Sequence, residues 1–252
     1  MSFIFALVFL SQYTDVYVPQ KPFYVESGCL GTVGIIETGI TARFNQGNDK
    51  FSVPVLSSIC SSFDGFNEFG LELPWVKAAK TDTSNRIAIG NLGITYKRRI
   101  IASQKYGYLA AGAKIELATS PDTFGIRDSL GGNKSRLGIG LSYTYEYPLI
   151  ADYHTLFGRL PIQATITINN NFLSLDNDSK ELEFNAAGNF AWGASAQIIP
   201  FDFAFAGASL IGNSRGIDFI PYAGISWFWF EAGVAYHTLG ENRIDAFLRF
   251  YM

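Results

Sequence analysis

Residues 136–149, R-L-G-I-G-L-S-Y-T-Y-E-Y-P-L, alternate along their whole length between apolar and small or polar side chains. Leucine, isoleucine and tyrosine occupy every second position, while glycine, serine and threonine with Arg136 and Glu146 occupy most of the others. Since successive side chains of a strand point to opposite faces, the stretch predicts a β-strand with one apolar, aromatic face and one polar face. Its fourteen residues are many for a strand, because globular strands usually have about 5–6.

Composition indicates which face of this strand meets lipid. The water-exposed side of a soluble sheet is polar and rich in large charged residues, whereas the polar side here consists mostly of small residues. In the whole chain 16% of the residues are charged and 15% are aromatic, and soluble domains have about 25% charged residues. We therefore expect the apolar face to contact lipid and the polar face to line an enclosed lumen.

The totals limit the fold and the partners. The chain has 252 residues and no linker-like stretch that would divide it, so we expect one barrel domain over residues 30–252. A net charge of −3 and a pI near 5.4 lack the basic footprint of a nucleic-acid-binding protein. No apolar run reaches the roughly 20 residues of a membrane-spanning helix. A membrane protein of this sequence must therefore close its strands into a barrel.

The beginning of the chain is apolar over a short length. Residues 3–10, F-I-F-A-L-V-F-L, are too few to span a bilayer and match the core of a secretory signal. No Lys or Arg precedes them and no clear small-x-small cleavage site follows. We interpret residues 1–12 as a signal-peptide remnant, with a mature strand or plug as the alternative. Residues 13–29 mix Tyr, Val, Pro and charges without a period, and we interpret them as a lead-in or plug.

The two cysteines, Cys29 and Cys60, are too few for a metal site, which needs more ligands at short spacing. We therefore expect neither a metal nor another cofactor. In the first predicted hairpin the two cysteines fall near the same end of adjacent strands. They can form a disulfide in an oxidising envelope compartment, and the alternative is two small residues with no bond between them.

The alternating pattern recurs along the chain, separated by turn-forming segments such as N-Q-G-N-D-K at residues 45–50. Counting the alternating segments predicts about twelve strands, an even number as in single-chain bacterial barrels. The predicted fold is all-β: a transmembrane, antiparallel, up-and-down β-barrel in the outer membrane of a Gram-negative bacterium.

Alternation within each predicted strand assigns side chains to the two faces. The charged residues and the histidine on the inward positions are predicted to line the lumen: Glu37, Arg43, Glu68, Glu72, Lys97, Arg99, Lys114, Glu116, Arg136, Glu146, Glu231, His237, Asp245 and Arg249. The outward positions are predicted to face lipid and include Leu137, Ile139, Leu141, Tyr143, Ile166 and Trp192. In a barrel of intermediate size the inward charges either pair across the wall and hold its shape, or form a polar path gated by Arg/Glu pairs.

Two histidines, His154 and His237, are the candidates for acid–base chemistry. His154 falls in a predicted periplasmic turn, His237 falls on an inward position, and no G-x-S-x-G turn occurs. Isolated histidines are more often ordinary loop or lumen residues than catalysts. We therefore expect no enzyme and no catalytic residue.

Several segments resemble, in order, the outer-membrane barrel family named for the meta-pathway of phenol degradation, which is regarded as a transporter family. The segments are K-P-F-Y-V-E-S-G-C-L-G-T-V-G, F-D-G-F-N-E-F-G-L-E-L-P-W, G-N-L-G-I-T-Y-K, A-A-G-A-K-I-E-L-A-T-S, W-G-A-S-A-Q-I-I-P and F-E-A-G-V-A-Y-H-T-L-G, spread from residue 21 to residue 240. The resemblance implies an envelope barrel that passes small hydrophobic or aromatic compounds, and it carries over no catalytic residue.

The predicted function is therefore an outer-membrane, porin-like channel or transporter that passes small hydrophobic or aromatic solutes through a polar-lined lumen. Its expected partners are outer-membrane lipid and such a solute, and the oligomeric state is left open. One alternative is a structural or adhesive outer-membrane barrel without transport, and a second is a barrel lipid hydrolase.

Overall fold

The structure, a computed structural model, describes residues 30, 33–45, 54–79, 85–103, 105–119, 134–147, 160–176, 180, 182–184, 190–201, 204–213, 216–227, 229–238 and 243–252. Within these ranges fourteen strands form one sheet. Their bounds are β1 (Ile36–Asn45), β2 (Pro54–Ser62), β3 (Asn67–Ala79), β4 (Asn85–Ile89), β5 (Leu92–Ser103), β6 (Gly107–Leu117), β7 (Lys134–Tyr147), β8 (Leu160–Asp176), β9 (Leu182–Phe184), β10 (Phe190–Phe201), β11 (Ala204–Asn213), β12 (Gly216–Trp227), β13 (Phe230–His237) and β14 (Arg243–Tyr251). Among the described residues no helix is long and apolar enough to cross a bilayer.

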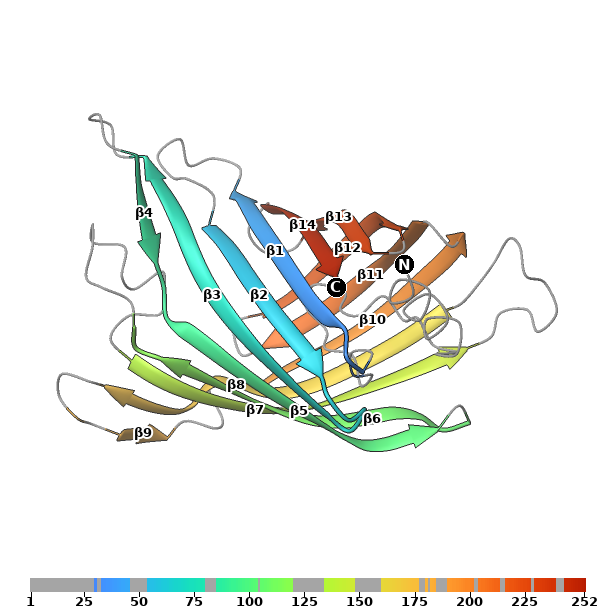
Figure 1. The fold of residues 1–252 in the computed structure, drawn as a ribbon, viewed down its shortest axis with the longest axis horizontal. Helices are drawn as coiled ribbons and strands as arrows, with labels where there is room; N and C mark the ends of the chain where they lie inside the picture. Colours follow the sequence, from blue (N-terminus) through green and yellow to red (C-terminus); the bar gives the residue numbers. More distant parts are fainter. Residues whose placement is uncertain are drawn as a thin grey trace, which may run out of the picture.

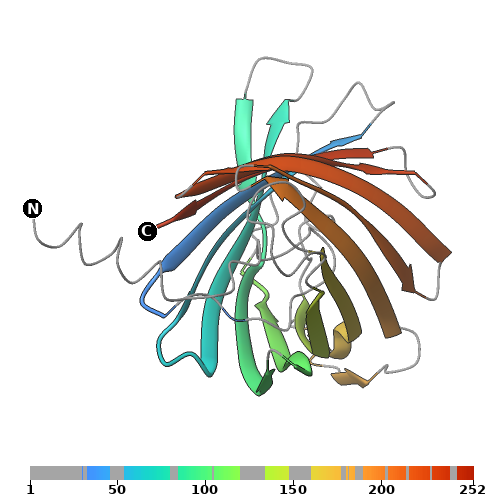
Figure 2. The ribbon, with the colours of Figure 1, turned by 90° about the vertical axis from the view of Figure 1, so that its right-hand side faces the viewer.

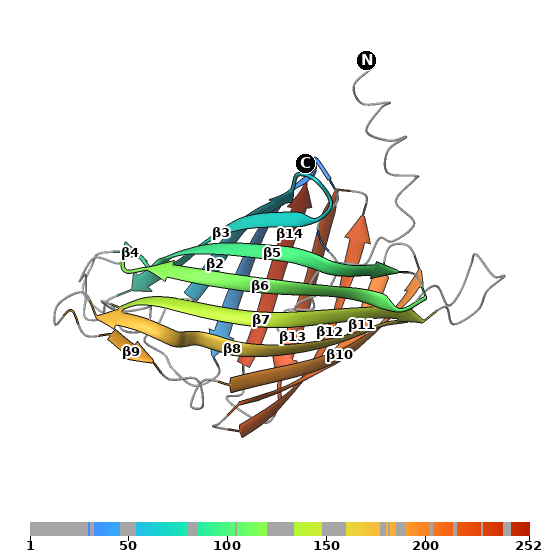
Figure 3. The same ribbon diagram turned by 90° about the horizontal axis from the view of Figure 1, so that it is seen from below.

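Strands that follow one another in the sequence mostly lie side by side, and the pairs are antiparallel (Figure 1). The order across the sheet is β10-β11-β12-β13-β14-β1-β2-β3-β5-β6-β7-β8-β9, and β4 pairs with β3. In addition, β8 pairs with β10, and Figure 3 shows β5, β6, β7, β8 and β10 side by side. The sheet curls around an interior (Figure 2). The predicted antiparallel, up-and-down sheet is therefore confirmed, and closure into a barrel of about twelve strands stays a prediction.

The turn between β2 and β3 is held by one aspartate. Asp64 Oδ1 accepts hydrogen bonds from the backbone N–H groups of Phe66 at 2.8 Å and Asn67 at 2.6 Å. Its Oδ2 accepts a third from the side-chain amide of Asn67 at 2.5 Å. The Asn67 side chain and these backbone donors stabilise the carboxylate and so lower the pKa of Asp64. Gly65, with φ 72°, supplies the left-handed residue of the turn.

One segment that the alternation predicts as a single strand, residues 87–99, is divided into β4 and β5. Both parts pair with β3, through Trp75↔Ile89 and Glu72↔Gly93. The Pro74 carbonyl faces this side of β3 and accepts a hydrogen bond from Gly90 N–H at 2.7 Å. In a strand the N–H and C=O of one residue point to the same side, and proline has no N–H to donate. The ladder is therefore interrupted opposite Pro74.

The two faces of β7 differ in exposure as well as in polarity. Ile139 and Leu141 are 40% and 49% exposed, whereas Ser142 and Thr144 are 3% and 0% exposed. A single curled sheet buries side chains on its concave side, so the small polar residues lie on the inner face and the large apolar ones on the outer face. The buried side chains of this molecule thus lie on the inner face of the sheet.

Candidate functional site

The structure buries half of the predicted lumen residues and leaves most of the others partly exposed. Those buried are Glu37, Glu68, Lys97, Glu231, His237, Asp245 and Arg249. Those of intermediate exposure are Glu72, Arg99, Lys114, Glu116 and Arg136. Arg43 and Glu146 lie in β1 and β7, and their side chains fall outside the described part of the structure.

Most of the predicted lipid-facing residues are described too. Ile139, Leu141 and Tyr143 are exposed, and Leu137 and Trp192 are of intermediate exposure. Ile166 lies in β8, and its side chain falls outside the described part of the structure. Cys29 also falls outside the described residues. Cys60 is buried in β2. The disulfide and the lipid-facing and pore-lining roles stay predictions.

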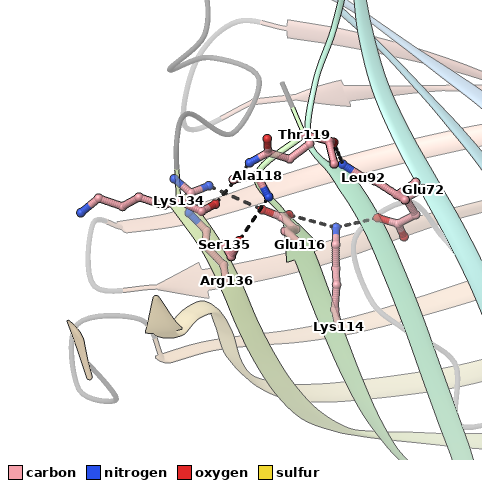
Figure 4. A network of polar contacts seen from close by, with 10 residues as sticks. Glu72, Leu92, Lys114, Glu116, Ala118, Thr119, Lys134, Ser135 and Arg136 are labelled. Atoms are coloured by element: carbon pink, nitrogen blue, oxygen red, sulfur yellow. Dashed lines mark hydrogen bonds and ion pairs between the residues drawn. The ribbon is translucent and has the colours of Figure 1, made fainter. Parts of the chain in front are cut away.

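Four charged residues of alternating sign form a chain of contacts across β3, β6 and β7, which we call the charge ladder (Figure 4). Lys114 Nζ lies 2.5 Å from Glu72 Oε2 and 3.3 Å from Glu116 Oε1. Arg136 Nη1 lies 3.5 Å from the other oxygen of Glu116. These side chains are 15–28% exposed, so the ladder remains accessible to solvent from the interior.

A glycine gives the ladder its path across β5. Gly93 is paired with Glu72 on one side and with Glu116 on the other. A Cβ atom at Gly93 would lie 3.2 Å from the Cβ of Glu72 and 3.3 Å from the Cε of Lys114. The absence of a side chain at Gly93 therefore leaves the space over which Lys114 reaches Glu72.

Side-chain hydrogen bonds tie the strand ends beside the ladder (Figure 4). The Leu92 N–H donates to Thr119 Oγ1 at 2.9 Å, which joins the start of β5 to the end of β6. The Ala118 N–H donates to Ser135 Oγ at 3.2 Å, which joins the end of β6 to the start of β7. The strands that carry Lys114 and its neighbours are thus held together where their regular ladders end.

A second group of interior charges is more deeply buried than the ladder. Lys97 Nζ lies 3.9 Å from Glu68 Oε1, and the two side chains are 7% and 6% exposed. Arg249 Nε lies 3.8 Å from Glu37 Oε1, and Arg249 Nη1 lies 3.4 Å from Glu231 Oε2. All three side chains are at most 9% exposed. Removing one partner of such a pair leaves an uncompensated buried charge. These pairs therefore hold neighbouring strands in place.

His237 lies between charged side chains that contact both of its ring nitrogens. Its Nδ1 lies 2.5 Å from Asp218 Oδ2, and its Nε2 lies 3.4 Å from Asp245 Oδ2 and 2.8 Å from Arg243 Nη2. Arg243 Nε in turn lies 3.0 Å from Asp245 Oδ1. The prediction from sequence missed Asp218 and Arg243, although Arg243 shares the inward alternation of Asp245. With both nitrogens engaged, the geometry favours a structural histidine over a general base.

The inner face also carries an apolar patch that the sequence did not predict. We define the apolar inner patch as Phe205, Ile220, Tyr222, Ala235 and Phe247, which are 0–6% exposed and pack together. The Tyr222 hydroxyl donates to Gln197 Oε1 at 3.2 Å. The alternation at residues 201–211 is apolar on both faces, so it gave no register for Phe205. The interior along β11–β14 thus combines this apolar patch with the buried charges of β13 and β14, such as Glu231 and Arg249, whereas the charge ladder lies along β3–β7.

Among the described residues no group of three or more His, Cys, Asp or Glu side chains is arranged to hold a metal ion. The interior carboxylates contact cationic side chains instead, as at Lys114 and Arg249. The expectation of no metal or other cofactor stays a prediction.

Comparison with protein-family models and with curated proteins finds no match. Comparison with solved structures finds the COG4313 outer membrane channel from Pseudomonas putida F1, with a TM-score of 0.55, 10% identity, and coverage of 92% of this chain and 99% of that one. This chain therefore shares the fold of that protein. A further match is the Acinetobacter baumannii outer membrane protein Omp33, with a TM-score of 0.48, 8% identity, and coverage of 86% and 97%. Membership of the phenol-degradation family stays a prediction.

Proposed function

We propose that this protein is a channel of the bacterial outer membrane, built as a closed barrel of twelve strands. The pairing of β8 with β10 supports closure, because it joins one end of the strand order, β10, to β8, the last strand but one at the other end. Twelve strands then form the ring, which are the fourteen strands of the sheet without β4 and β9. Of these two, β4 pairs with β3 and β9 pairs with β8. The likeness in fold to an outer-membrane channel supports the same assignment.

The observation that carries the proposal is the separation of side chains between the two faces. Large apolar residues such as Leu141, Phe219 and Val234 are 40–54% exposed on the outside, while charged residues are gathered within. A soluble protein does not leave so extensive an apolar surface in water. Outer-membrane lipid covers this surface, and exposed aromatic residues at one barrel end, including Trp227 and Trp229, supply an interfacial belt.

The solute is a small hydrophobic or aromatic compound that passes through a lumen with both polar and apolar walls. The apolar inner patch supports this class, because Phe205, Tyr222 and Phe247 present aromatic side chains on the face that encloses the interior. The path follows the charge ladder, since its side chains are more exposed than the buried pairs of Glu68 and Arg249. No residue is assigned to catalysis.

The test is ion conductance and solute uptake by the purified chain after reconstitution into lipid. The wild type should form discrete ion-conducting channels in planar bilayers, and vesicles that contain it should swell in small neutral solutes. Arg136→Gln should change the conductance, because it removes a solvent-accessible charge from the ladder. Arg98→Gln, on an exposed position of β5, is the control and should leave conductance unchanged. A wild type that folds into vesicles with neither conductance nor swelling would contradict the channel function.

A further inference from the structure

One interior cation, Arg99, differs from the others in having no carboxylate beside it among the described residues. The other cations whose side chains are described on the inner face lie within 2.5–3.9 Å of a carboxylate oxygen: Lys97, Lys114, Arg136, Arg243 and Arg249. For Arg99 no carboxylate of the described residues lies within ion-pair distance, and its Nε is buried without a hydrogen-bond acceptor. A buried N–H without an acceptor costs free energy, so this guanidinium is poised for an acceptor from outside the chain.

The backbone next to Arg99 departs from a regular ladder. Arg99 lies two residues beyond Lys97 on the inner face of β5, and its N–H donates to the Phe66 carbonyl at 2.8 Å. The pairing of β5 with β6 shifts register between Arg99 and Ile101. Such bulges redirect side chains and occur often beside functional sites. The side chain is of intermediate exposure, so a molecule in the lumen can reach it.

The neighbouring strands carry small side chains at the positions paired across from Arg99. Arg99 is paired with Ala110 of β6, and Ala110 is paired in turn with Ser142 of β7. Both are small, and they are 0% and 3% exposed. At these two paired positions, the strands next to Arg99 therefore carry small neutral side chains rather than a carboxylate.

We propose that Arg99 binds the carboxylate of a small organic acid inside the lumen. A guanidinium presents two parallel N–H donors that match the two oxygens of a carboxylate. A single guanidinium balances one negative charge, which favours a monocarboxylate over a phosphate dianion. The inference rests on the proposed channel function and narrows its solutes to small compounds that carry a carboxylate.

The test titrates the full chain in detergent micelles with benzoate and with its neutral isostere benzamide. Binding is followed by the Nε–H signals of ¹⁵N-arginine-labelled protein, and the Arg99 signal is identified by its loss in Arg99→Gln. Benzoate should shift the Arg99 signal and benzamide should not. The affinity for benzoate should fall about tenfold or more in Arg99→Gln, as expected for a lost charge-assisted hydrogen bond. Arg98→Gln, the exposed neighbour on β5, is the matched control and should bind benzoate as the wild type does.

Equal benzoate affinity in the wild type and in Arg99→Gln would overturn the proposal, as would equal binding of benzamide. If Arg99→Gln fails to fold, the titrations of the wild type and of Arg99→Lys are compared instead. Arg99→Lys keeps the positive charge and loses the paired N–H donors of the guanidinium, so weaker benzoate binding by this variant would support the proposal and equal binding would overturn it. Block of the channel current by benzoate provides the functional measurement. A wild type without current would contradict the channel function, whereas the benzoate titration would still decide whether Arg99 binds a carboxylate.

Discussion

Lys114 holds the charge ladder together, and its replacement by methionine gives the sharpest test of that network. The ammonium lies 2.5 Å from Glu72 and 3.3 Å from Glu116, with 28% of the side chain exposed. Hydrogen bonds to charged groups contribute about 1.5–3 kcal/mol each, and partial exposure and desolvation reduce the net value. We expect Lys114→Met to lower the free energy of unfolding by about 2 kcal/mol, because methionine keeps most of the volume and removes the charge.

A double-mutant cycle isolates the contact itself. Lys114→Met, Glu72→Gln and the double variant should give a coupling energy of about 1–2 kcal/mol, measured by urea unfolding from micelles with tryptophan fluorescence. The comparison cycle pairs Lys114→Met with Glu68→Gln, because Glu68 contacts Lys97 rather than Lys114. Its coupling should stay below about 0.5 kcal/mol. Equal coupling in the two cycles would refute the assignment of the ladder as a specific network.

Three further perturbations test other parts of the structure. Leu141→Arg puts a charge on the outer face near the middle of β7 and should cost about 2–4 kcal/mol of folding into lipid vesicles, while Leu141→Met should fold normally; equal folding of the two would argue against lipid contact. Gly224→Ala places a Cβ atom 2.4 Å from both the Ala232 carbonyl oxygen and the Phe205 ring. The free energy of unfolding in urea should therefore fall by about 1–3 kcal/mol. An unchanged unfolding midpoint would contradict this packing. Because the pKa of Asp64 is lowered in the folded protein, its ionised form adds stability above about pH 4, and this stability is lost as the pH falls through the lowered pKa. Asp64→Asn should flatten the pH dependence of the unfolding midpoint in that range. An unaltered pH profile would count against the hydrogen bonds of the turn.

The strands and their antiparallel order could be predicted from sequence because alternation is a local signal. In β7 every second residue is apolar, and Leu141 and Ser142 differ in exposure as that pattern implies. The division of residues 87–99 into two strands could not be predicted in this way, because its cause, Pro74, lies on the neighbouring strand. The alternation within one segment carries no information about which backbone N–H groups the neighbouring strand offers as hydrogen-bond donors.

The site was harder to predict, because contacts between strands depend on register. Alternation puts Lys114 and Glu116 on the inner face, but the contact with Glu72 depends on Gly93 between them. The apolar inner patch was missed because residues 201–211 are apolar on both faces. Its signal lay in cross-strand pairs of an aromatic residue with glycine, such as Phe205↔Gly224, and such pairs become visible only once the strands are aligned.

Two adjacent residues of β5 report whether lipid lies outside the curled sheet and an aqueous lumen lies inside it. Ile94 is 37% exposed, and Thr95, the next residue, lies on the same face as Lys97. Nitroxide labels at each position, in a background with Cys29→Ser and Cys60→Ser, are compared by electron paramagnetic resonance in vesicles. We expect oxygen dissolved in lipid to relax mainly the label at Ile94, and a water-soluble nickel complex to relax mainly the label at Thr95. Equal relaxation at the two positions, or the reverse order, would contradict this arrangement.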